Sequence, residues 1–440
     1  MNKDPSGPRD VAGKSASALA EQPALSVLIL TRNERENIGS LVARIRTVTA
    51  KLAVDAEIVV VDASSDGTLE EALRLGCRGF RQTGKGYADA FRQGMEAARG
   101  KFIVTIDADH SHEPEFLYHM WALRNDADVI IGSRYVPAGR AKMTTGRRLL
   151  SRMLNRLFSR VLALPYRDLS SGYRLYRRCV IESTAPLRGR TFDVLEEVLV
   201  KAYCQGWRIR EVPISYMPRS RGRSNASAIR FAAAYLSTLG SLWRLRNSAT
   251  AGDYDCRAFD SWIVPQRYWQ RRRFQIITDL VRGHSSVLDI GCGSSQIIRS
   301  LPAMVGMEIN PAKLRFLKST NPRLVQGSVG ALPFRDAVFT AVVCSEVIEH
   351  VPKSDVLLEE MNRVVERGGT LVLGTPDYGS RIWNVIEYWY DRLMPHSYGS
   401  EHIAHYTKAE LLDMVRKFGF EVVSVHHIVH SEIIVEGRKL

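Results

Sequence analysis

The sequence lacks a hydrophobic run long enough to cross a lipid bilayer. Its longest apolar stretch, Phe231 to Trp243, is shorter than the roughly 18 to 20 residues that a spanning helix needs, and arginines flank it. The segment from Met1 to about Glu21 is polar and has no apolar run of signal-peptide length. We therefore expect a protein that does not span a membrane and whose residues 1–23 form a disordered tail.

Cysteine is sparse and shows no pairing pattern. None of the six cysteines lies in a C-x-x-C pair. The sequence therefore predicts neither a disulfide framework nor a zinc knuckle, which fits a protein of the reducing cytosol.

Acidic residues are absent from one strongly basic segment. Between Gly139 and Arg167 there are eight lysines and arginines and no aspartate or glutamate, in a chain of net charge +14. A basic amphipathic helix is predicted here, with arginines every four residues at Arg148, Arg152, Arg156 and Arg160. A second helix, expected from Asn225 to Arg246, has a long apolar span with arginines at its edges. An anionic membrane surface suits both helices, whereas nucleic acid would favour an aromatic stacking platform. The alternative is a core helix with a solvated basic face.

Two separate alternations of apolar runs and helical stretches divide the chain. Each alternation predicts a layered α/β domain, and 440 residues exceed one ordinary hydrophobic core. We expect strands at residues 25–30, 57–61, 102–106 and 129–131 in the first domain, and at 287–290, 305–309, 341–344 and 371–373 in the second. The polar stretch from Asn247 to Asp260 separates them. The expected organisation is a first domain over residues 24–246, a linker over 247–262 and a second domain over 263–440.

Polar residues follow three of the expected strands in the first domain. They form the segments Thr31 to Asn37, Asp62 to Thr68, and Asp107-Ala108-Asp109. Ligands of open α/β sheets bind at the carboxyl ends of strands, so we expect these segments to converge on one crevice. Two carboxylates two residues apart can bind a divalent cation that also binds diphosphate oxygens. An isolated Asp-x-Asp is more often a solvated acidic turn, but this one has two companion segments.

In order and spacing, these segments resemble the family 2 glycosyltransferases of GT-A fold. Further segments resemble the dolichyl- or polyprenyl-phosphate mannosyltransferase branch, namely Gly84 to Gly86, Gly132 to Tyr135, Asp168 to Tyr176, and Arg219 to Ser224. The resemblance implies a nucleotide-sugar-binding GT-A domain that uses Mg²⁺ or Mn²⁺, held by Asp107 and Asp109, to transfer a sugar to polyprenyl phosphate. Ala63 stands where many relatives have a second aspartate, which leaves the choice between GDP and UDP sugars open.

The same resemblance implies a role for each matching residue. It implies nucleotide-sugar contacts from Thr31, Asn33, Glu34, Asp62, Asp66, Lys85 and Asp107. It also implies catalytic roles for Asp107, Asp109 and Glu197, and acceptor-phosphate contacts from Arg134, Arg219 and Ser224. A lipid phosphate is already an anion, so it can attack the sugar without a strong base if arginines and the metal hold both phosphates. For Glu197, a salt bridge on a helix surface is the plain alternative.

The second domain contains a tight glycine turn after its first strand. Gly291 and Gly293 precede a helix there, and their backbone amides can approach a ligand closely. The third glycine of the dinucleotide fingerprint is missing. The domain resembles the class I S-adenosylmethionine-dependent methyltransferases, which have a Rossmann-like fold, through this turn, Gly327 to Phe334, Cys344 to His350, and Arg367 to Gly369. The resemblance implies S-adenosylmethionine contacts from Asp289, Gly291, Cys292, Gly293, Glu308, Ser328, Val329 and Glu346.

An aromatic and histidine-rich stretch from Asp377 to Tyr406 is expected to shape the pocket for the methyl acceptor. His402 and His405 are candidates for a base or for metal ligands. Because no third ligand has a suitable spacing, structural hydrogen bonding is the favoured role. His350 is expected to line the pocket rather than to act as a base.

The leading hypothesis is a cytoplasmic bifunctional enzyme, peripheral on the inner face of the membrane. It transfers a sugar from a nucleotide sugar to polyprenyl phosphate, with inversion, and methylates a related glycan or lipid intermediate. One alternative is action on a saccharide acceptor in cell-surface polysaccharide synthesis. Another alternative is a scaffold in which one module has lost catalysis and only binds its ligand. Two departures from the family motifs keep this alternative open: Ala63, and Ser328, which stands where the methyltransferase family usually has an aspartate. The sequence leaves the sugar, the methyl acceptor and the oligomeric state open.

Overall fold

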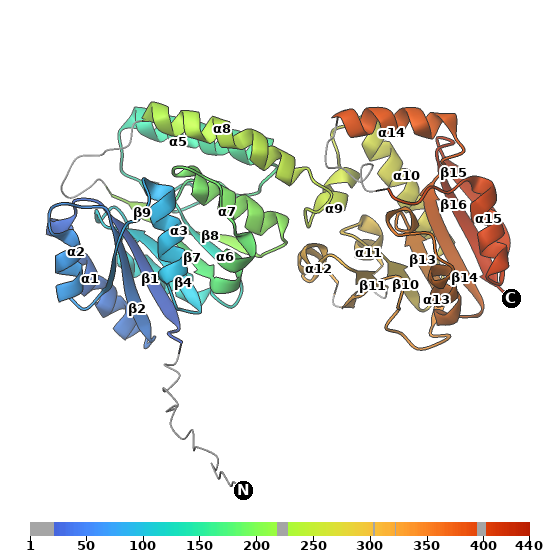
Figure 1. Cartoon of the computed structure of the whole chain (residues 1–440), viewed down its shortest axis with the longest axis horizontal. Helices are drawn as coiled ribbons and strands as arrows, with labels where there is room; N and C mark the ends of the chain where they lie inside the picture. Colours follow the sequence, from blue (N-terminus) through green and yellow to red (C-terminus); the bar gives the residue numbers. More distant parts are fainter. Residues whose placement is uncertain (1–21, 218–227, 302–303, 322, 394–401) are drawn as a thin grey trace, which may run out of the picture.

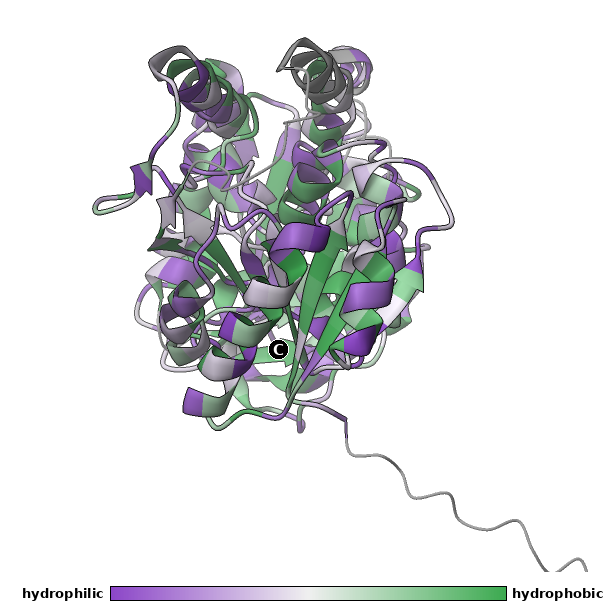
Figure 2. Cartoon of the chain, turned by 90° about the vertical axis from the view of Figure 1, so that its left-hand side faces the viewer, coloured by the Kyte–Doolittle hydropathy of each residue, from purple (hydrophilic) through white to green (hydrophobic). Residues whose placement is uncertain are grey.

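A computed structural model describes residues 22–217, 228–301, 304–321, 323–393 and 402–440. These residues form two α/β units, one from each half of the chain, that lie next to each other (Figure 1). Each unit is built on a seven-stranded sheet, which confirms the predicted α/β fold class of both halves. Coloured by hydropathy, the central strands are mainly apolar and the outer helices carry most of the hydrophilic residues (Figure 2).

The sheet of the first unit has the strand order β3-β2-β1-β4-β7-β5-β8. Its strands are β1 (Leu25–Thr31), β2 (Ala56–Asp62), β3 (Arg78–Arg81), β4 (Phe102–Asp107), β5 (Val129–Ser133), β7 (Arg174–Arg177) and β8 (Ile209–Pro213). All pairs are parallel except those of β7, which is antiparallel to both neighbours. A separate pair joins β6 (Arg140–Ala141) to β9 (Ser215–Tyr216). The four predicted strands are therefore confirmed, and the sheet gains three more.

Both faces of this sheet are buried. The helical elements of the unit are α1 (Arg35–Lys51), α2 (Thr68–Arg74), α3 (Tyr87–Ala97), η1 (Pro114–Phe116), α4 (Leu117–Ala122), α5 (Thr145–Val161), α6 (Arg178–Thr184), α7 (Asp193–Cys204) and α8 (Ala228–Arg246). Within β1, Leu28 joins one hydrophobic core, whereas Val27 and Ile29 join another. Successive side chains of a strand point to opposite faces, so two cores mean that helices cover the sheet on each side.

The sheet of the second unit has the strand order β12-β11-β10-β13-β14-β16-β15. Its strands are β10 (Val287–Ile290), β11 (Val305–Glu308), β12 (Leu324–Gln326), β13 (Phe339–Ser345), β14 (Val365–Pro376), β15 (Phe420–Ile428) and β16 (Glu432–Lys439). Its helical elements are α10 (Val264–Leu280), α11 (Gln296–Ser300), α12 (Pro311–Leu317), η2 (Ile348–His350), α13 (Val356–Val364), α14 (Arg381–Leu393) and α15 (Lys408–Lys417). β16 is antiparallel to β14 and β15, and the other pairs are parallel. Leu288 and Val287 enter different cores, so this sheet is also covered on both faces.

The predicted linker over residues 247–262 contains a short helix, α9 (Tyr254–Phe259), and it is well packed. Arg246, at the end of α8, is fully buried and pairs with Asp253, with Nη2 2.5 Å from Oδ2. The N–H of Gly252 donates to the carbonyl oxygen of Cys204 (2.6 Å). Arg246 therefore faces the interior, unlike the membrane-facing arginine expected at this helix edge. The domain boundaries themselves stay a prediction.

The two units touch where the end of α7 meets α12. Nε of Arg315 donates to the carbonyl oxygen of Gln205 (2.7 Å), and its guanidinium lies 4.4 Å from the centre of the Trp207 ring. Gly206 has a φ of +75°, and a side chain there would come within 2.2 Å of the carbonyl oxygen of Ala312. Only glycine allows this close approach of two backbones without strain.

The predicted basic helix is present as α5, and its outer surface is both apolar and basic. Leu149 and Met153 are 59% and 61% exposed, whereas Phe158 is buried against the unit. The exposed arginines of the helix are Arg147, Arg152, Arg156 and Arg160, whereas Arg148 is partly buried. α5 and α8 lie at the top of the first unit in Figure 1. No helix among the described residues has the length and the apolar character to cross a bilayer.

Candidate active sites

The predicted polar segments of the first unit meet at one edge of its sheet. Parallel pairing sets Thr31 opposite Asp62, and it sets Leu30 opposite Asp107. The carboxyl ends of β1, β2 and β4 therefore lie side by side, which is where open α/β sheets bind their ligands.

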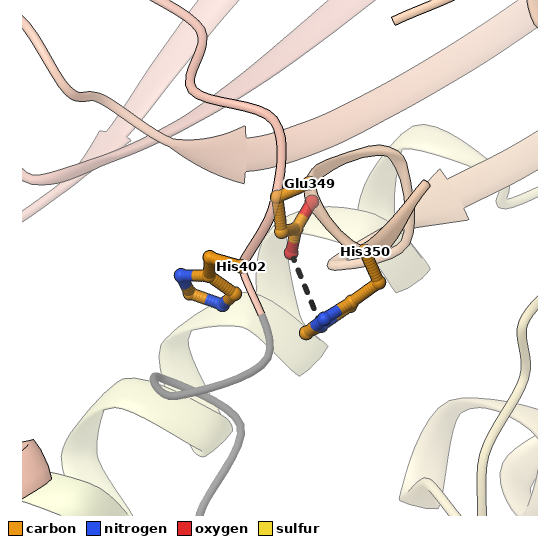
Figure 3. A group of neighbouring side chains, drawn as sticks. All are labelled: Glu349, His350 and His402. Atoms are coloured by element: carbon orange, nitrogen blue, oxygen red, sulfur yellow. Dashed lines mark ion pairs between the residues drawn. The ribbon is translucent and has the colours of Figure 1, made fainter. Parts of the chain in front are cut away.

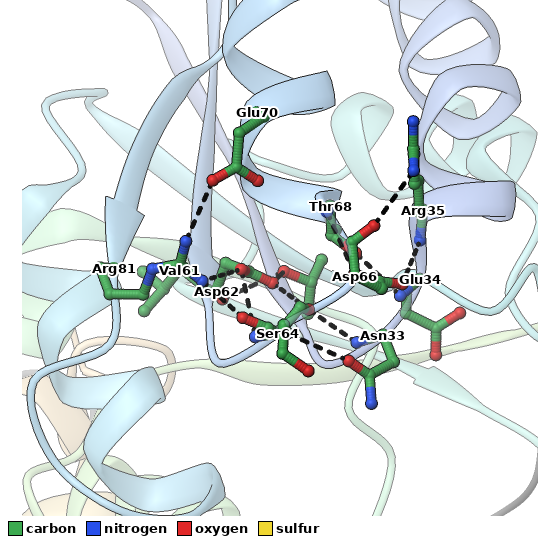
Figure 4. Close-up of polar contacts among 12 residues, drawn as sticks. Asn33, Glu34, Arg35, Val61, Asp62, Ser64, Asp66, Thr68, Glu70 and Arg81 are labelled. Carbon is green, nitrogen blue, oxygen red and sulfur yellow. Dashed lines mark hydrogen bonds and ion pairs between the residues drawn. The ribbon is translucent and has the colours of Figure 1, made fainter.

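Asp62 is fully buried and organises the loops at this edge (Figure 4). Oδ1 accepts a hydrogen bond from the Thr31 hydroxyl (2.6 Å). Oδ2 accepts bonds from the backbone N–H of Ser64 (3.1 Å) and from Nη1 of Arg81 (3.0 Å). Sequence reasoning missed Arg81, because a contact between β2 and β3 leaves no local pattern. Direct contact of Asp62 with a nucleoside stays a prediction.

Asn33, Glu34 and Asp66 join the loop after β1 to the loop after β2 (Figure 4). The backbone N–H of Asn33 donates to the Ser64 hydroxyl (2.6 Å), and that of Glu34 donates to the Thr68 hydroxyl (3.0 Å). Asn33 has a left-handed φ of 58°. Partial burial would raise the pKa of Asp66, but hydrogen bonds from Thr68 and from the Arg35 backbone lower it. The two loops thus form one polar platform.

The two carboxylates of the Asp-x-Asp pair differ in solvent exposure. The side chain of Asp107 is 42% exposed, and its Oδ2 lies 3.3 Å from Nδ1 of His112. Asp109 is buried, with Oδ1 accepting the backbone N–H of Ser111 (3.0 Å). Sequence reasoning missed His112, whose only signal is its place three residues after Asp109. The metal site of Asp107 and Asp109 stays a prediction.

The predicted segment Asp168 to Tyr176 reaches Asp107, and so does Tyr87, which directly follows the predicted segment Gly84 to Gly86. A side chain added at Gly172 would lie 3.5 Å from Oδ1 of Asp107 and 3.7 Å from the Tyr87 hydroxyl. Burial, followed by the charge of Asp107, raises the pKa of Tyr87. Lys85 precedes Tyr87 by two residues, its side chain is exposed, and its backbone N–H donates to Asp89 (2.8 Å).

Arg134 forms a buried two-pronged ion pair with Asp168. Its Nε and Nη2 lie 2.8 and 2.7 Å from the two carboxylate oxygens, and Nη2 also donates to the Ser170 hydroxyl (2.8 Å). Burial would raise the pKa of Asp168, but Arg134 holds it below its usual value. The segment Asp168 to Tyr176 therefore fixes this arginine. Of the other predicted phosphate ligands, Arg219 and Ser224 lie outside the described residues.

Glu197 holds a loop rather than lying free on the surface. Its carboxylate accepts the backbone N–H groups of Arg188 (2.8 Å) and Gly189 (2.7 Å) and pairs with Lys201 (2.7 Å). These contacts support a structural role, and a catalytic role stays a prediction. Burial raises the pKa of the neighbouring Glu196, which is within electrostatic reach of Asp168.

The glycine turn of the second unit needs glycine at both predicted positions. Gly291 and Gly293 have left-handed φ angles of 65° and 57°. A side chain at Gly291 would come within 2.3 Å of a methyl group of Val347. Glu308 closes the turn, because its carboxylate accepts the N–H groups of Gly293 (2.9 Å) and Asn310 (2.8 Å).

The remaining predicted cofactor residues surround this turn. Asp289 is buried, and burial, followed by the charge of Glu308, raises its pKa to about 8. Cys292 and Val329 are buried, whereas Ser328 is exposed. Glu346 pairs with Arg273 of α10 (3.0 Å). Their contacts with S-adenosylmethionine stay a prediction.

Asp255 of α9 also lies on the glycine turn, which sequence reasoning missed by assigning it to the linker. Its Oδ2 accepts the backbone N–H of Ser294 (2.8 Å) and lies 3.1 Å from Nζ of Lys313. The only signal in the sequence was that Asp255 is one of the first acidic residues after a long stretch with few of them.

Comparisons with known proteins agree with this arrangement. Residues 26–184 match the family described as glycosyl transferase family 2, and residues 288–373 match a methyltransferase domain. Polyprenol monophosphomannose synthase of Mycolicibacterium smegmatis is 34% identical over 232 residues, covering 49% of this chain and 86% of that protein. Dolichol-phosphate mannosyltransferase of Pyrococcus furiosus is 36% identical over 215 residues, covering 46% of this chain and 58% of that protein. A solved S-adenosylmethionine-dependent methyltransferase of Thermotoga maritima is 20% identical, covers 42% of this chain and 96% of that one, and has a TM-score of 0.36. Both predicted family resemblances are confirmed by the two family matches.

Proposed function

Because the chain belongs to glycosyl transferase family 2 and also carries a methyltransferase domain, we propose that it is a bifunctional enzyme. Its first half transfers a hexose from a GDP-mannose or UDP-glucose type of donor to polyprenyl phosphate, with inversion. Its second half uses S-adenosylmethionine to methylate a related glycan or lipid intermediate. The observation that carries the proposal is the convergence of Thr31, Asp62 and Asp107 at one sheet edge.

In the sugar-transfer site, the platform formed by the loops after β1 and β2 takes the nucleoside. Asp107 is open enough to contact a Mg²⁺ or Mn²⁺ ion, and Asp109 is fixed by the Ser111 N–H. Such an ion neutralises charge on a departing nucleoside diphosphate. An oxygen of the acceptor phosphate attacks the sugar carbon, and it needs no strong base because it is already ionised.

The acceptor phosphate lies beside Arg134 in this proposal. Nε and Nη2 of Arg134 bind Asp168 and Ser170, which leaves Nη1 to donate to a phosphate oxygen. The ion pair with Asp168 sets the direction of the guanidinium before the acceptor arrives. Arg219 and Ser224 belong to the same proposal on the strength of the motif alone.

A lipid acceptor must be collected from a membrane, and α5 offers a surface for this. Exposed leucine and methionine side chains can enter the headgroup region while neighbouring arginines bind anionic lipid. We therefore propose that the protein lies peripherally on the inner, cytoplasmic face of the membrane.

In the methyl-transfer site, the glycine turn after β10 takes the cofactor, which supplies the reactive methyl group. Glu308 and Asp289 lie at this turn to bind its hydroxyl and amino groups. We propose that the aromatic stretch after β14 borders the acceptor. Within this stretch, Tyr378 stacks on His405 with ring centres 4.0 Å apart.

The direct test is to incubate the full chain with a short prenyl phosphate, a panel of nucleotide sugars and radiolabelled S-adenosylmethionine. The expected products are a prenyl-phosphate sugar and a labelled methylated glycan or lipid. If the sugar is transferred to a soluble saccharide and not to the prenyl phosphate, the acceptor is a saccharide and the lipid-acceptor proposal is wrong. Binding of both ligands without any product would favour the scaffold.

A further inference from the structure

Three side chains able to bind a metal ion meet in the second unit, although they come from distant parts of the sequence (Figure 3). Glu349 and His350 lie on η2, directly after β13. His402 lies beyond the long aromatic stretch. The carbonyl oxygen of Glu349 accepts the backbone N–H groups of Ile403 (2.8 Å) and Ala404 (3.0 Å), which holds His402 beside η2.

The ligand atoms are close to the spacing of a metal site. Nε2 of His350 lies 3.9 Å from Oε1 of Glu349, and all three ligand atoms lie within 4.8 Å of one another. Around a tetrahedral zinc ion, neighbouring ligand atoms are roughly 3.4 Å apart, as bond lengths of about 2.1 Å require. A small movement of the side chains would therefore complete the site.

The Glu349 carboxylate is fully buried and only half satisfied. Its Oε2 accepts a bond from the Thr375 hydroxyl (3.0 Å), whereas Oε1 has no hydrogen-bond partner among the described residues. An unsatisfied buried carboxylate is costly, and a bound cation would remove this cost.

His402 is oriented as metal-binding histidines usually are. Its Nδ1 lies 2.7 Å from the Tyr378 hydroxyl and 3.2 Å from a carboxylate oxygen of Glu387, which leaves Nε2 as the ligand atom. A carboxylate on the second ring nitrogen fixes the tautomer and direction of a ligand histidine.

We propose that Glu349, His350 and His402 bind a first-row divalent cation, with Zn²⁺ as the best match. Two imidazoles and one carboxylate suit Zn²⁺ better than Mg²⁺, which prefers oxygen ligands only. The site is therefore different in chemistry from the Asp107 and Asp109 pair. Glu349 is the third ligand of this site. From the sequence, a structural role was expected for His402 because no third ligand had a suitable spacing.

The position of the cluster gives the cation a task that rests on the proposed methyltransferase function. Thr375 is near the end of β14 and η2 follows β13, so the cluster lies at the same sheet edge as the glycine turn after β10. With three protein ligands, the cation keeps a position open for a hydroxyl oxygen of the acceptor. The hydroxyl loses its proton to solvent, and its oxygen attacks the methyl carbon of the cofactor. The carbon–sulfur bond breaks, and its electron pair remains on sulfur as a neutral thioether.

Cobalt titration of the full chain tests this site, with Asp107→Ala and Asp109→Ala introduced to silence the first metal site. Co²⁺ bound to imidazole nitrogen in a four- or five-coordinate site has visible absorption bands, and we expect about one equivalent that Zn²⁺ displaces. Mutating a group that only hydrogen-bonds to a metal ligand typically lowers metal affinity by about 10- to 100-fold. Because Glu349 and His402 are ligands themselves, Glu349→Gln and His402→Gln should weaken cobalt binding by about 100-fold or more. The matched control is His426→Gln, because His426 contacts Ser424 outside the cluster.

The affinity of the same variants for S-adenosylmethionine is measured by calorimetry. Because the cofactor site needs a folded second unit, cofactor binding shows that this unit is folded. His350→Gln provides a further variant, since its ring is 20% exposed and tolerates change best. No cobalt bands in a chain that binds the cofactor would overturn the cation site and leave the methyltransferase proposal standing. Equal cobalt binding by wild type and by the folded variants would also overturn the site. Cobalt binding without cofactor binding would support the site and overturn the methyltransferase function.

Discussion

The two candidate sites satisfy their acidic side chains in different ways. In the first unit, Asp62 is bound by Thr31 and Arg81, and Asp168 is bound by Arg134. In the second unit, three acids, at Asp289, Glu346 and Glu349, each keep one carboxylate oxygen with no hydrogen-bond partner among the described residues. Buried polar groups are normally paired, so the protein itself holds Asp62 and Asp168 in place, although the Ser111 hydroxyl and Nδ1 of His112 at the first site have no hydrogen-bond partner among the described residues. The three acids of the second site are expected to gain partners from its ligands.

The largest effect that separates the two sites is expected from Gly291→Val. The new side chain would clash with Val347 and force a left-handed φ on valine, which blocks the turn. S-adenosylmethionine binding should fall below detection in calorimetry, while sugar transfer stays at the wild-type rate. If Gly291→Val binds S-adenosylmethionine with normal affinity, the cofactor does not bind at this glycine turn, and the comparison of the two sites fails.

The reciprocal change is Asp107→Ala or Asp109→Ala. Loss of a group that stabilises developing charge costs about 10²- to 10³-fold in rate, so sugar transfer should fall by at least that factor. Cofactor affinity should not change, because both carboxylates lie in the first unit. The assay is radiolabelled sugar transfer to a short prenyl phosphate with and without a chelator. Undiminished transfer in metal-free buffer would contradict the metal assignment.

The proposed membrane-binding surface of α5 is tested by replacing Arg148, Arg152, Arg156 and Arg160 with glutamine. Each arginine near the headgroups contributes about 1 kcal/mol, screened by salt, so binding to anionic vesicles should weaken by roughly 100-fold or more. Activity on a water-soluble prenyl phosphate should survive. Co-sedimentation at two salt concentrations measures the effect.

A control with the same change of charge replaces four arginines elsewhere on the surface, at Arg74, Arg271, Arg282 and Arg416. It should keep most of the vesicle binding. Equal loss in both variants would mean that net charge, and not the face of α5, attracts the membrane.

The smallest effect is expected from Asp255→Asn, which tests the connection between the units. The substitution keeps the shape but removes the charge beside Ser294 and Lys313. Losing one such hydrogen bond typically costs about 0.5 to 1.5 kcal/mol, so cofactor affinity should fall by roughly 2- to 10-fold. Sugar transfer should be unaffected. A loss in both reactions would show that the two sites are coupled through α9.

The sequence predicted most of the strands that have continuous apolar runs, although not β16 with its run from Ile433 to Val435, and it missed β3 and β7, which have no such run. β7 (Arg174–Arg177) has an arginine at each end, and β3 (Arg78–Arg81) reads Arg-Gly-Phe-Arg. Their place in the sheet depends on tertiary contacts, such as the Arg174 bond to the carbonyl oxygen of Leu195 (2.6 Å). Strand propensity cannot predict such contacts, because they involve residues far apart in the chain.

The candidate sites show the same division. Residues of continuous motifs, such as Asp107 or Gly291, were predicted because each motif places its polar or small residues at a strand end. Arg81, Asp255 and Thr375 were not predicted, because each reaches its partner from another element of the fold. The cluster of Glu349 and His402 is the extreme case, since 53 residues separate its members and backbone hydrogen bonds bring them together.

The central claim is that one chain holds two chemically independent active sites. The most direct measurement follows both reactions in parallel, with labelled nucleotide sugar and labelled S-adenosylmethionine, in wild type, Asp107→Ala and Gly291→Val. Asp107→Ala should lose only sugar transfer, and Gly291→Val should lose only methyl transfer to an acceptor supplied ready-made. Loss of both reactions in either folded variant, or no methyl transfer by wild type to any glycan or lipid intermediate, would show that the sites are not independent active sites.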